Sequence, residues 1–275
     1  MLSAALLFKD ALYGALVLSV VCAVLGVYVV LRRIVFVGAA IAQLSSLGIA
    51  LALWMGGRGW LTGATSHPVE FALAFALAGS LFFGMGGSGR AGVPPDATIG
   101  VTYAVAAAAG ILFISKASVG EAHDIFLSGN ILGITRTDTY VLLAVSIPVL
   151  LAHLVFYKEF LFVSFDRETA RTLGYKVTFW NLFLYFTLGL VIAFAMQFAG
   201  VMLVFNYLVL PAVTGMLVSR SMRGIFIVAI ASALLASFIG FTLSVPFDLP
   251  SGPAIIATSG ALALVGWVVR SFQRR

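Results

Sequence analysis

The chain has 275 residues, of which 62% are hydrophobic and only 9% are charged. Soluble domains carry about 25% charged residues, so this composition excludes a water-soluble protein and makes lipid the solvent for most of the surface. The net charge of +6 does not indicate nucleic-acid binding, because the basic residues are scattered over short loops and form no patch.

Apolar segments of bilayer length recur along the chain and predict an all-α, polytopic membrane protein with about nine spans. A helix needs about 20 apolar residues to cross the hydrocarbon core. The third segment is short, and the connection near Gln197 is so tight that the sixth and seventh could be one broken hairpin, so the count stays open between eight and ten. The segments lie at residues 11–31, 34–54, 70–84, 97–115, 139–157, 178–196, 200–218, 224–245 and 253–269.

The loops between these segments divide the basic residues unevenly. With nine spans, 12 of the 16 Lys and Arg residues fall on one side and 4 on the other. The positive-inside rule then places the C-terminus in the cytoplasm and the N-terminus outside. We expect one transmembrane domain over residues 1–275, in the inner or plasma membrane, with a first span that is retained rather than cleaved as a signal peptide. The smaller group is Lys9, Arg58, Lys116 and Arg136.

Two predicted spans carry small residues at every fourth position. One stripe is Gly100, Ala104 and Ala108, and the other is Ser232, Ala236, Gly240 and Ser244. Small residues let helix backbones approach closely in membranes. The stripes indicate either ordinary packing within the bundle or a face that binds a second copy of the chain.

No catalytic motif is present. The sequence has no G-x-x-x-x-G-K-[ST] loop for nucleotide phosphates and no H-E-x-x-H metal site. Its single cysteine, Cys22, excludes a disulfide within the chain. We therefore expect neither an enzyme nor a cofactor bound by this chain.

The longest charged segment, residues 158–177, predicts a short cytoplasmic helix. Asp166 suits a helix N-cap and Gly174 suits the position after the C-cap. Between them the charged residues face water, and Ala170 and Leu173 offer a small apolar face. The segment is either a solvated loop or a surface on which a soluble partner docks.

Five segments together resemble the ABC-type permeases that import zinc, manganese or iron. They are residues 31–53 (LRRIVFVGAAIAQLSSLGIALAL), 127–135 (LSGNILGIT), 164–175 (SFDRETARTLGY), 195–221 (AMQFAGVMLVFNYLVLPAVTGMLVSRS) and 248–253 (DLPSGP). Their order and spacing match along nearly the whole chain.

The resemblance implies a permease homodimer that binds two ATPase subunits, which hydrolyse ATP, and receives its cargo from an extracytoplasmic binding protein. It also implies that the helix at about 166–174 is the coupling helix. The residues that would contact the ATPase are Asp166, Arg167, Glu168, Ala170, Leu173 and Gly174.

The sequence departs from the family pattern where the family usually carries ionisable residues. The usual Asp and His of the second span are replaced by Ala39 and Gln43, and a frequent His of the fourth span by Ala104. Asn130 replaces an Asp. Ala39, Gln43 and Ser46 lie at i, i+4 and i+7 and so share one helix face. We expect this face and Asn130 to line the pathway, unless Gln43 simply bonds a neighbouring helix. The metal ligands stay unknown.

The predicted outer loop at 116–138 holds Glu121, His123, Asp124 and Asp138. Carboxylate and imidazole groups bind divalent metals, so Glu121, His123 and Asp124 are candidates for weak capture at the mouth of the pathway. An ordinary solvated loop explains the same residues.

Three kinds of function compete. The first is the ABC permease for a divalent metal of the zinc or manganese class, or for another cargo such as a metal chelate. The second is a stand-alone secondary transporter, which the absence of ionisable residues deep in the spans disfavours. The third is a membrane enzyme, which the missing catalytic residues disfavour.

The predicted orientation can be tested by cysteine labelling in intact cells. A Glu168→Cys variant should react with a membrane-impermeant maleimide only after the membrane is opened, because the basic loops stay in the cytoplasm. Labelling from outside intact cells would contradict the orientation.

Overall fold

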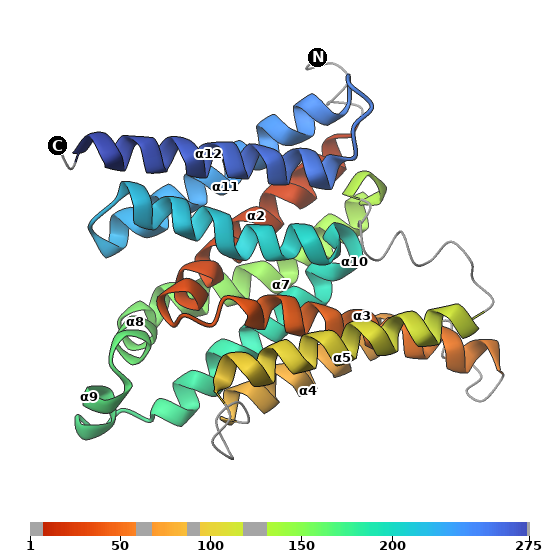
Figure 1. Ribbon diagram of the computed structural model, residues 1–275, viewed down its shortest axis with the longest axis horizontal. Helices are drawn as coiled ribbons and strands as arrows, with labels where there is room; N and C mark the ends of the chain where they lie inside the picture. Colours follow the sequence, from red (N-terminus) through yellow and green to blue (C-terminus); the bar gives the residue numbers. More distant parts are fainter. Residues whose placement is uncertain (1–7, 59–67, 87–93, 118–130, 274–275) are drawn as a thin grey trace.

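The computed structural model describes residues 8–58, 68–86, 94–117 and 131–273, and all its regular secondary structure there is helical. The helices form one bundle, and most of the long helices extend from one end of the bundle to the other (Figure 1). Their bounds are α2 Lys9–Leu31, α3 Phe36–Gly57, α4 Pro68–Gly84, α5 Pro95–Lys116, α7 Arg136–Val155, α8 Tyr157–Phe165, α9 Arg167–Thr172, α10 Val177–Val218, α11 Met222–Ser244 and α12 Ser251–Gln273, with a 3₁₀ turn, η2, at Ile131–Gly133.

Seven helices in the described ranges are long and apolar enough to cross a membrane, and α4, with 17 residues, is shorter. Each segment predicted from the sequence is helical, and the sixth and seventh fall in the single helix α10. The all-α, multi-pass architecture is thus confirmed. A count of nine crossings and the orientation of the termini stay predictions.

Helix α10 is broken at Gly200. Its 42 residues would extend about 63 Å as a straight helix, twice the thickness of the hydrocarbon core. Gly200 has φ 69° and ψ 167°, a conformation that residues with a Cβ rarely adopt. The ribbon of α10 doubles back near this point (Figure 1), so residues 177–199 and 201–218 form two arms of a hairpin. The break lies three residues from the predicted connection at Gln197.

The two arms of α10 form the centre of the bundle. They pack against α2, α3, α4, α11 and α12, and α3 is further covered by α4 and α5. Most of the apolar window of α2, α3 and α10 is buried, whereas only 22–28% of the windows of α5, α7 and α12 is buried. The outer helices therefore present the surface available to lipid or to another subunit.

The two stripes of small residues have different roles. All four residues of the α11 stripe are buried, and a Cβ on Gly240 would lie 2.5 Å from the Cα of Ile255 in α12. That stripe is ordinary bundle packing. Gly100, Ala104 and Ala108 are exposed on α5, and a Cβ on Gly100 would meet nothing within 4 Å. The α5 stripe is left unused within the described chain.

Long-range hydrogen bonds join the helices at both ends of the bundle. At one end the Thr139 hydroxyl of α7 donates to the carbonyl of Asp10 in α2 (3.2 Å). At the other end Arg32, which follows α2, donates to Ser164 of α8 and Asn181 of α10. This second end carries α9 and the C-terminus (left in Figure 1).

Replacing glycines in α11 and α12 tests how tightly these helices pack. Gly240→Ala should destabilise the protein by about 1–3 kcal/mol, because the added methyl group meets the backbone of α12. Gly260→Ala is the matched control: its methyl group meets nothing within 4 Å, and alanine is the better helix former, so stability should be unchanged or rise by up to about 1 kcal/mol. Thermal unfolding in detergent measures both. Equal effects of the two changes would contradict the assigned packing.

Candidate translocation face and docking helix

Ala39, Gln43 and Ser46 form one face of α3, here called the pathway face. This face is buried but retains a small solvent-exposed fraction. These residues are 7%, 6% and 8% exposed, whereas Ala40 and Ala42 are 0% exposed. The pathway face therefore borders a narrow space rather than a fully packed contact.

Neighbouring contacts locate this space. Gly38 faces Leu208 in the second arm of α10, and Leu47 lies against Gly110 of α5. A helix turns by about 100° per residue, so Gly38 and Leu47 point about 180° apart. The pathway face lies about 80–140° round from Gly38, between those two directions. It therefore faces the seam between α5 and the second arm of α10.

The polar groups of the pathway face are neutral. No hydrogen bond joins the Gln43 side chain to another described residue, so the alternative in which Gln43 bonds a neighbouring helix has no support in those ranges. The buried hydroxyl of Ser45, on the adjacent side of α3, also has no partner there. No group of three His, Cys, Asp or Glu that could hold a metal occurs among the described residues. Amide and hydroxyl groups can solvate a passing ion but make a weak site for a dehydrated one.

The predicted capture residues Glu121, His123 and Asp124, and the pathway residue Asn130, lie outside the described residues, so their roles stay predictions. Asp138 is described and has a structural role. Its carboxylate accepts hydrogen bonds from the backbone amide (2.9 Å) and hydroxyl (2.6 Å) of Thr135, forming a capping box at the start of α7.

Helix α9 is short but capped at both ends. The Asp166 carboxylate accepts hydrogen bonds from the hydroxyl (2.6 Å) and backbone amide (3.0 Å) of Thr169 and from the amide of Glu168 (3.1 Å). These bonds hold the pKa of Asp166 below its ordinary value, so the cap is lost only as the pH falls through that lowered pKa. Gly174 has φ 84°, and the amide of Tyr175 donates to the carbonyl of Ala170 (3.0 Å), as in a Schellman motif.

One expectation about α9 is corrected. Ala170 is 0% exposed and packs with Val163 of α8 and Val177 of α10, whereas Leu173 is 65% exposed. Ala170 therefore anchors α9 to the bundle and cannot touch a partner, and the two residues do not form one exposed apolar face. The exposed residues of this candidate docking helix and its C-cap are Arg167, Glu168, Thr169, Arg171, Thr172 and Leu173.

Asn181, in the first turns of α10, links α9 to α2, and the sequence carries no signal for this. Its Oδ1 accepts hydrogen bonds from Arg32 Nη1 (2.6 Å) and Arg167 Nη2 (2.8 Å), and its Nδ2 donates to the carbonyl of Gly84 (2.5 Å). An isolated Asn at a helix start is indistinguishable from any polar loop residue until the distant arginines are brought to it.

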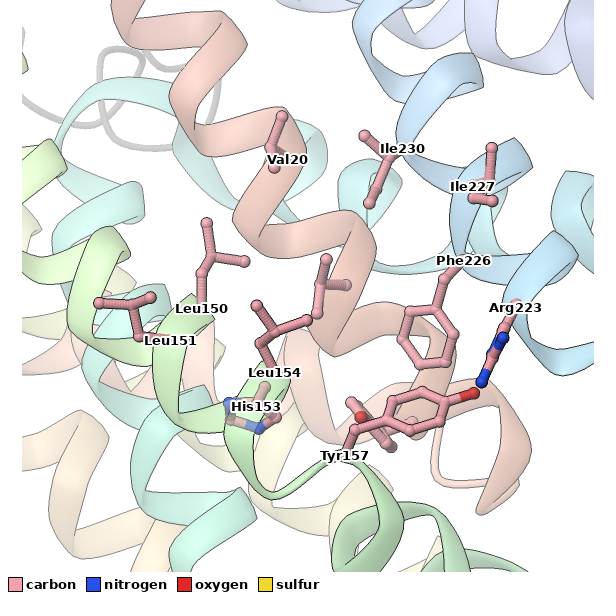
Figure 2. Close-up of a pocket in the computed structure, with 12 residues that line it drawn as sticks. Val20, Leu150, Leu151, His153, Leu154, Tyr157, Arg223, Phe226, Ile227 and Ile230 are labelled. Atoms are coloured by element: carbon pink, nitrogen blue, oxygen red, sulfur yellow. The ribbon is translucent and has the colours of Figure 1, made fainter.

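A groove of about 500 Å³ lies between α2, α7 and α11. Figure 2 shows aliphatic side chains lining it, with Tyr157 and Arg223 at one end. His153 is buried beside it and stacks on Phe160 with 4.3 Å between the ring centroids, and its Nδ1 bonds the carbonyl of Val149. His153 is thus part of an aromatic cluster, and the walls of the groove hold no set of metal ligands.

Comparisons with known proteins bear on the family and the fold of the chain. Residues 5–270 match the model of the ABC 3 transport family. The manganese import system permease protein ScaB of Streptococcus gordonii is 31% identical over 268 residues, 97% of this chain and 92% of that protein. The chelated iron transport system membrane protein YfeD of Yersinia pestis is 29% identical, over 94% of this chain and 84% of that protein. In the structure of PsaBC from Streptococcus pneumoniae in complex with Fab, one chain superposes with a TM-score of 0.80 at 28% identity, over 94% of this chain and 90% of that one.

Restoring the replaced ligands tests the pathway face. Because the face borders a space, the double variant Ala39→Asp, Gln43→His should bind Mn²⁺ or Zn²⁺ and be stabilised by it. If the face were fully packed, a buried carboxylate would cost several kcal/mol. Metal binding by calorimetry and thermal stability with and without metal distinguish these results. A destabilised variant without metal affinity would reject the assignment. The control is Ala40→Asp with Gln43→His, in which the new carboxylate lies off the pathway face.

Proposed function

Because the chain belongs to the ABC 3 transport family, we propose that it is the membrane-spanning subunit of an ATP-driven importer and that its cargo is a divalent metal ion of the manganese class. One observation carries the proposal: the family match covers residues 5–270 and thus includes both the pathway face and α9. A relative that is 31% identical over nearly the whole chain is named a manganese import permease.

In this proposal ATP is hydrolysed on a partner subunit that docks on α9. The chain itself has no phosphate-binding loop. Capping at both ends and the buried Ala170 make α9 a rigid projection, while Glu168, Arg171 and Leu173 remain exposed for contact. A rigid, anchored helix can transmit a displacement of the ATPase to α8 and α10.

The proposed assembly contains two copies of the chain. Gly100, Ala104 and Ala108 leave an exposed strip of small side chains on α5, to which a second membrane helix can approach closely. The seam beside the pathway face is bordered by the same α5, so a second copy there would place two pathway faces near one axis. A binding protein outside the membrane would deliver the cargo to the predicted outer loops.

A metal chelate is the second candidate cargo. The pathway face presents Gln43 and Ser46 and no ionisable group, which suits a metal whose charge is already balanced by other ligands. A relative named for chelated iron transport, 29% identical to this chain, is consistent with that reading.

Reconstitution tests the function. Proteoliposomes that hold the chain with its ATPase and binding protein should take up ⁵⁴Mn²⁺ only with ATP, and excess chelator should abolish uptake. Uptake of the chelated metal alone would favour the second candidate, and ATP-independent uptake would contradict an importer driven by ATP.

The coupling role of α9 is tested in the same vesicles. Gly174→Val places a β-branched residue at φ 84°, which costs about 1–2 kcal/mol, and should fray α9 and reduce uptake and cargo-stimulated ATP hydrolysis together. Gly174→Asn is the control, since asparagine tolerates this conformation and should retain activity. Coupled transport that survives Gly174→Val would argue against docking on α9.

A further inference from the structure

A cavity of about 450 Å³ lies beneath α9, where the ends of α2 and α4 meet α8 and α10. Three arginines line it, Arg32, Arg33 and Arg167, and no Asp or Glu does so. We call it the arginine cavity. It is large enough for a small polyatomic anion, since one water molecule occupies about 30 Å³.

Hydrogen bonds hold two of the arginines on one neutral atom. Arg32 Nη1 and Arg167 Nη2 both donate to Asn181 Oδ1, at 2.6 Å and 2.8 Å, and Arg32 Nε donates to the Ser164 hydroxyl at 2.9 Å. The orientation of the Asn181 amide follows from this network, because its Nδ2 donates to the carbonyl of Gly84.

The positive charge in the cavity has no counterpart in the described chain. Arg32 Nη2 is buried and has no hydrogen-bond partner there. Burial, and then the nearby charge of Arg167, lower the pKa of Arg32 to about 10, so it remains charged at neutral pH. Two guanidinium groups carry ten N–H donors, of which three are used in this network. The buried, unpaired Arg32 Nη2 and the repulsion between the two guanidinium groups favour an acceptor that is itself negative.

We propose that the arginine cavity binds a phosphate group that bridges Arg32 and Arg167. Guanidinium forks match phosphate oxygens in pairs, and a tetrahedral anion can accept from arginines that approach from two different helices. The phosphate comes either from the headgroup of an anionic phospholipid or from free inorganic phosphate; both share this chemistry.

The bound phosphate would strengthen the attachment of α9. Arg167 is the first residue of α9, and Arg32 directly follows α2, so the anion joins the docking helix to a central span and cancels the repulsion between them. This consequence for coupling rests on the proposed function, whereas the site itself rests only on the geometry.

Thermal unfolding of the purified chain, without transport partners, tests the site. One arm compares sodium phosphate with sodium chloride at equal ionic strength in detergent. The other compares nanodiscs of phosphatidylglycerol with nanodiscs of phosphatidylcholine. We expect stabilisation by phosphate if the free ion is the ligand, and by phosphatidylglycerol alone if the lipid headgroup is the ligand. Binding of ³²P-labelled phosphate by equilibrium dialysis gives a second readout that does not depend on stability.

Variants assign the effect to the arginine cavity. Arg167→Gln should lower the affinity for the stabilising ligand by about tenfold or more, which is the loss expected for one hydrogen bond between charged groups. Arg171→Gln removes an exposed charge on the same helix that does not line the cavity, and should leave binding unchanged. The proposal fails if neither arm stabilises the protein, if Arg171→Gln weakens binding as much as Arg167→Gln, or if acetate acts as well as phosphate, which would point to a partner's carboxylate.

Discussion

The reversal of the chain at Gly200 is the constraint on which the rest of the bundle depends. A helix of 42 residues cannot fit a bilayer unless it is broken, and a backbone in lipid must satisfy its own polar groups. A single residue with positive φ turns the chain at this point. The two arms that result supply the inner surface against which α2, α3, α4, α11 and α12 pack.

Close backbone contact, rather than polar pairing, holds these helices together. Glycines face the backbone of a neighbouring helix at Gly26, which meets Leu208, and at Gly48, which meets Phe71. Lipid removes the hydrophobic drive between spans, so such contacts must supply the packing. The same contacts bury α3 on the sides of α4 and α10. They leave its pathway face at the seam beside α5, the helix with the unused small-residue stripe.

Charged groups instead gather at the end of the bundle that carries α9. There Arg32, Arg167 and Asn181 join the short helix α9 to two long spans, and the buried Ala170 packs it against α8 and α10. The proposed energy input and the proposed phosphate site thus share one small region. It lies close to the start of α3, whose first three turns carry the pathway face.

Local patterns in the sequence were sufficient for the helices. Apolar length predicted the spans, and the break near Gln197 and the caps of α9 at Asp166 and Gly174 followed from residue types whose effects act within a few positions. Only the tertiary structure decided that Gly240 packs within the chain while Gly100 is exposed, that Ala170 points inward, and that Asn181 lies between two arginines. These facts depend on which distant helices meet, and helix periodicity alone is the same whichever neighbour a face contacts.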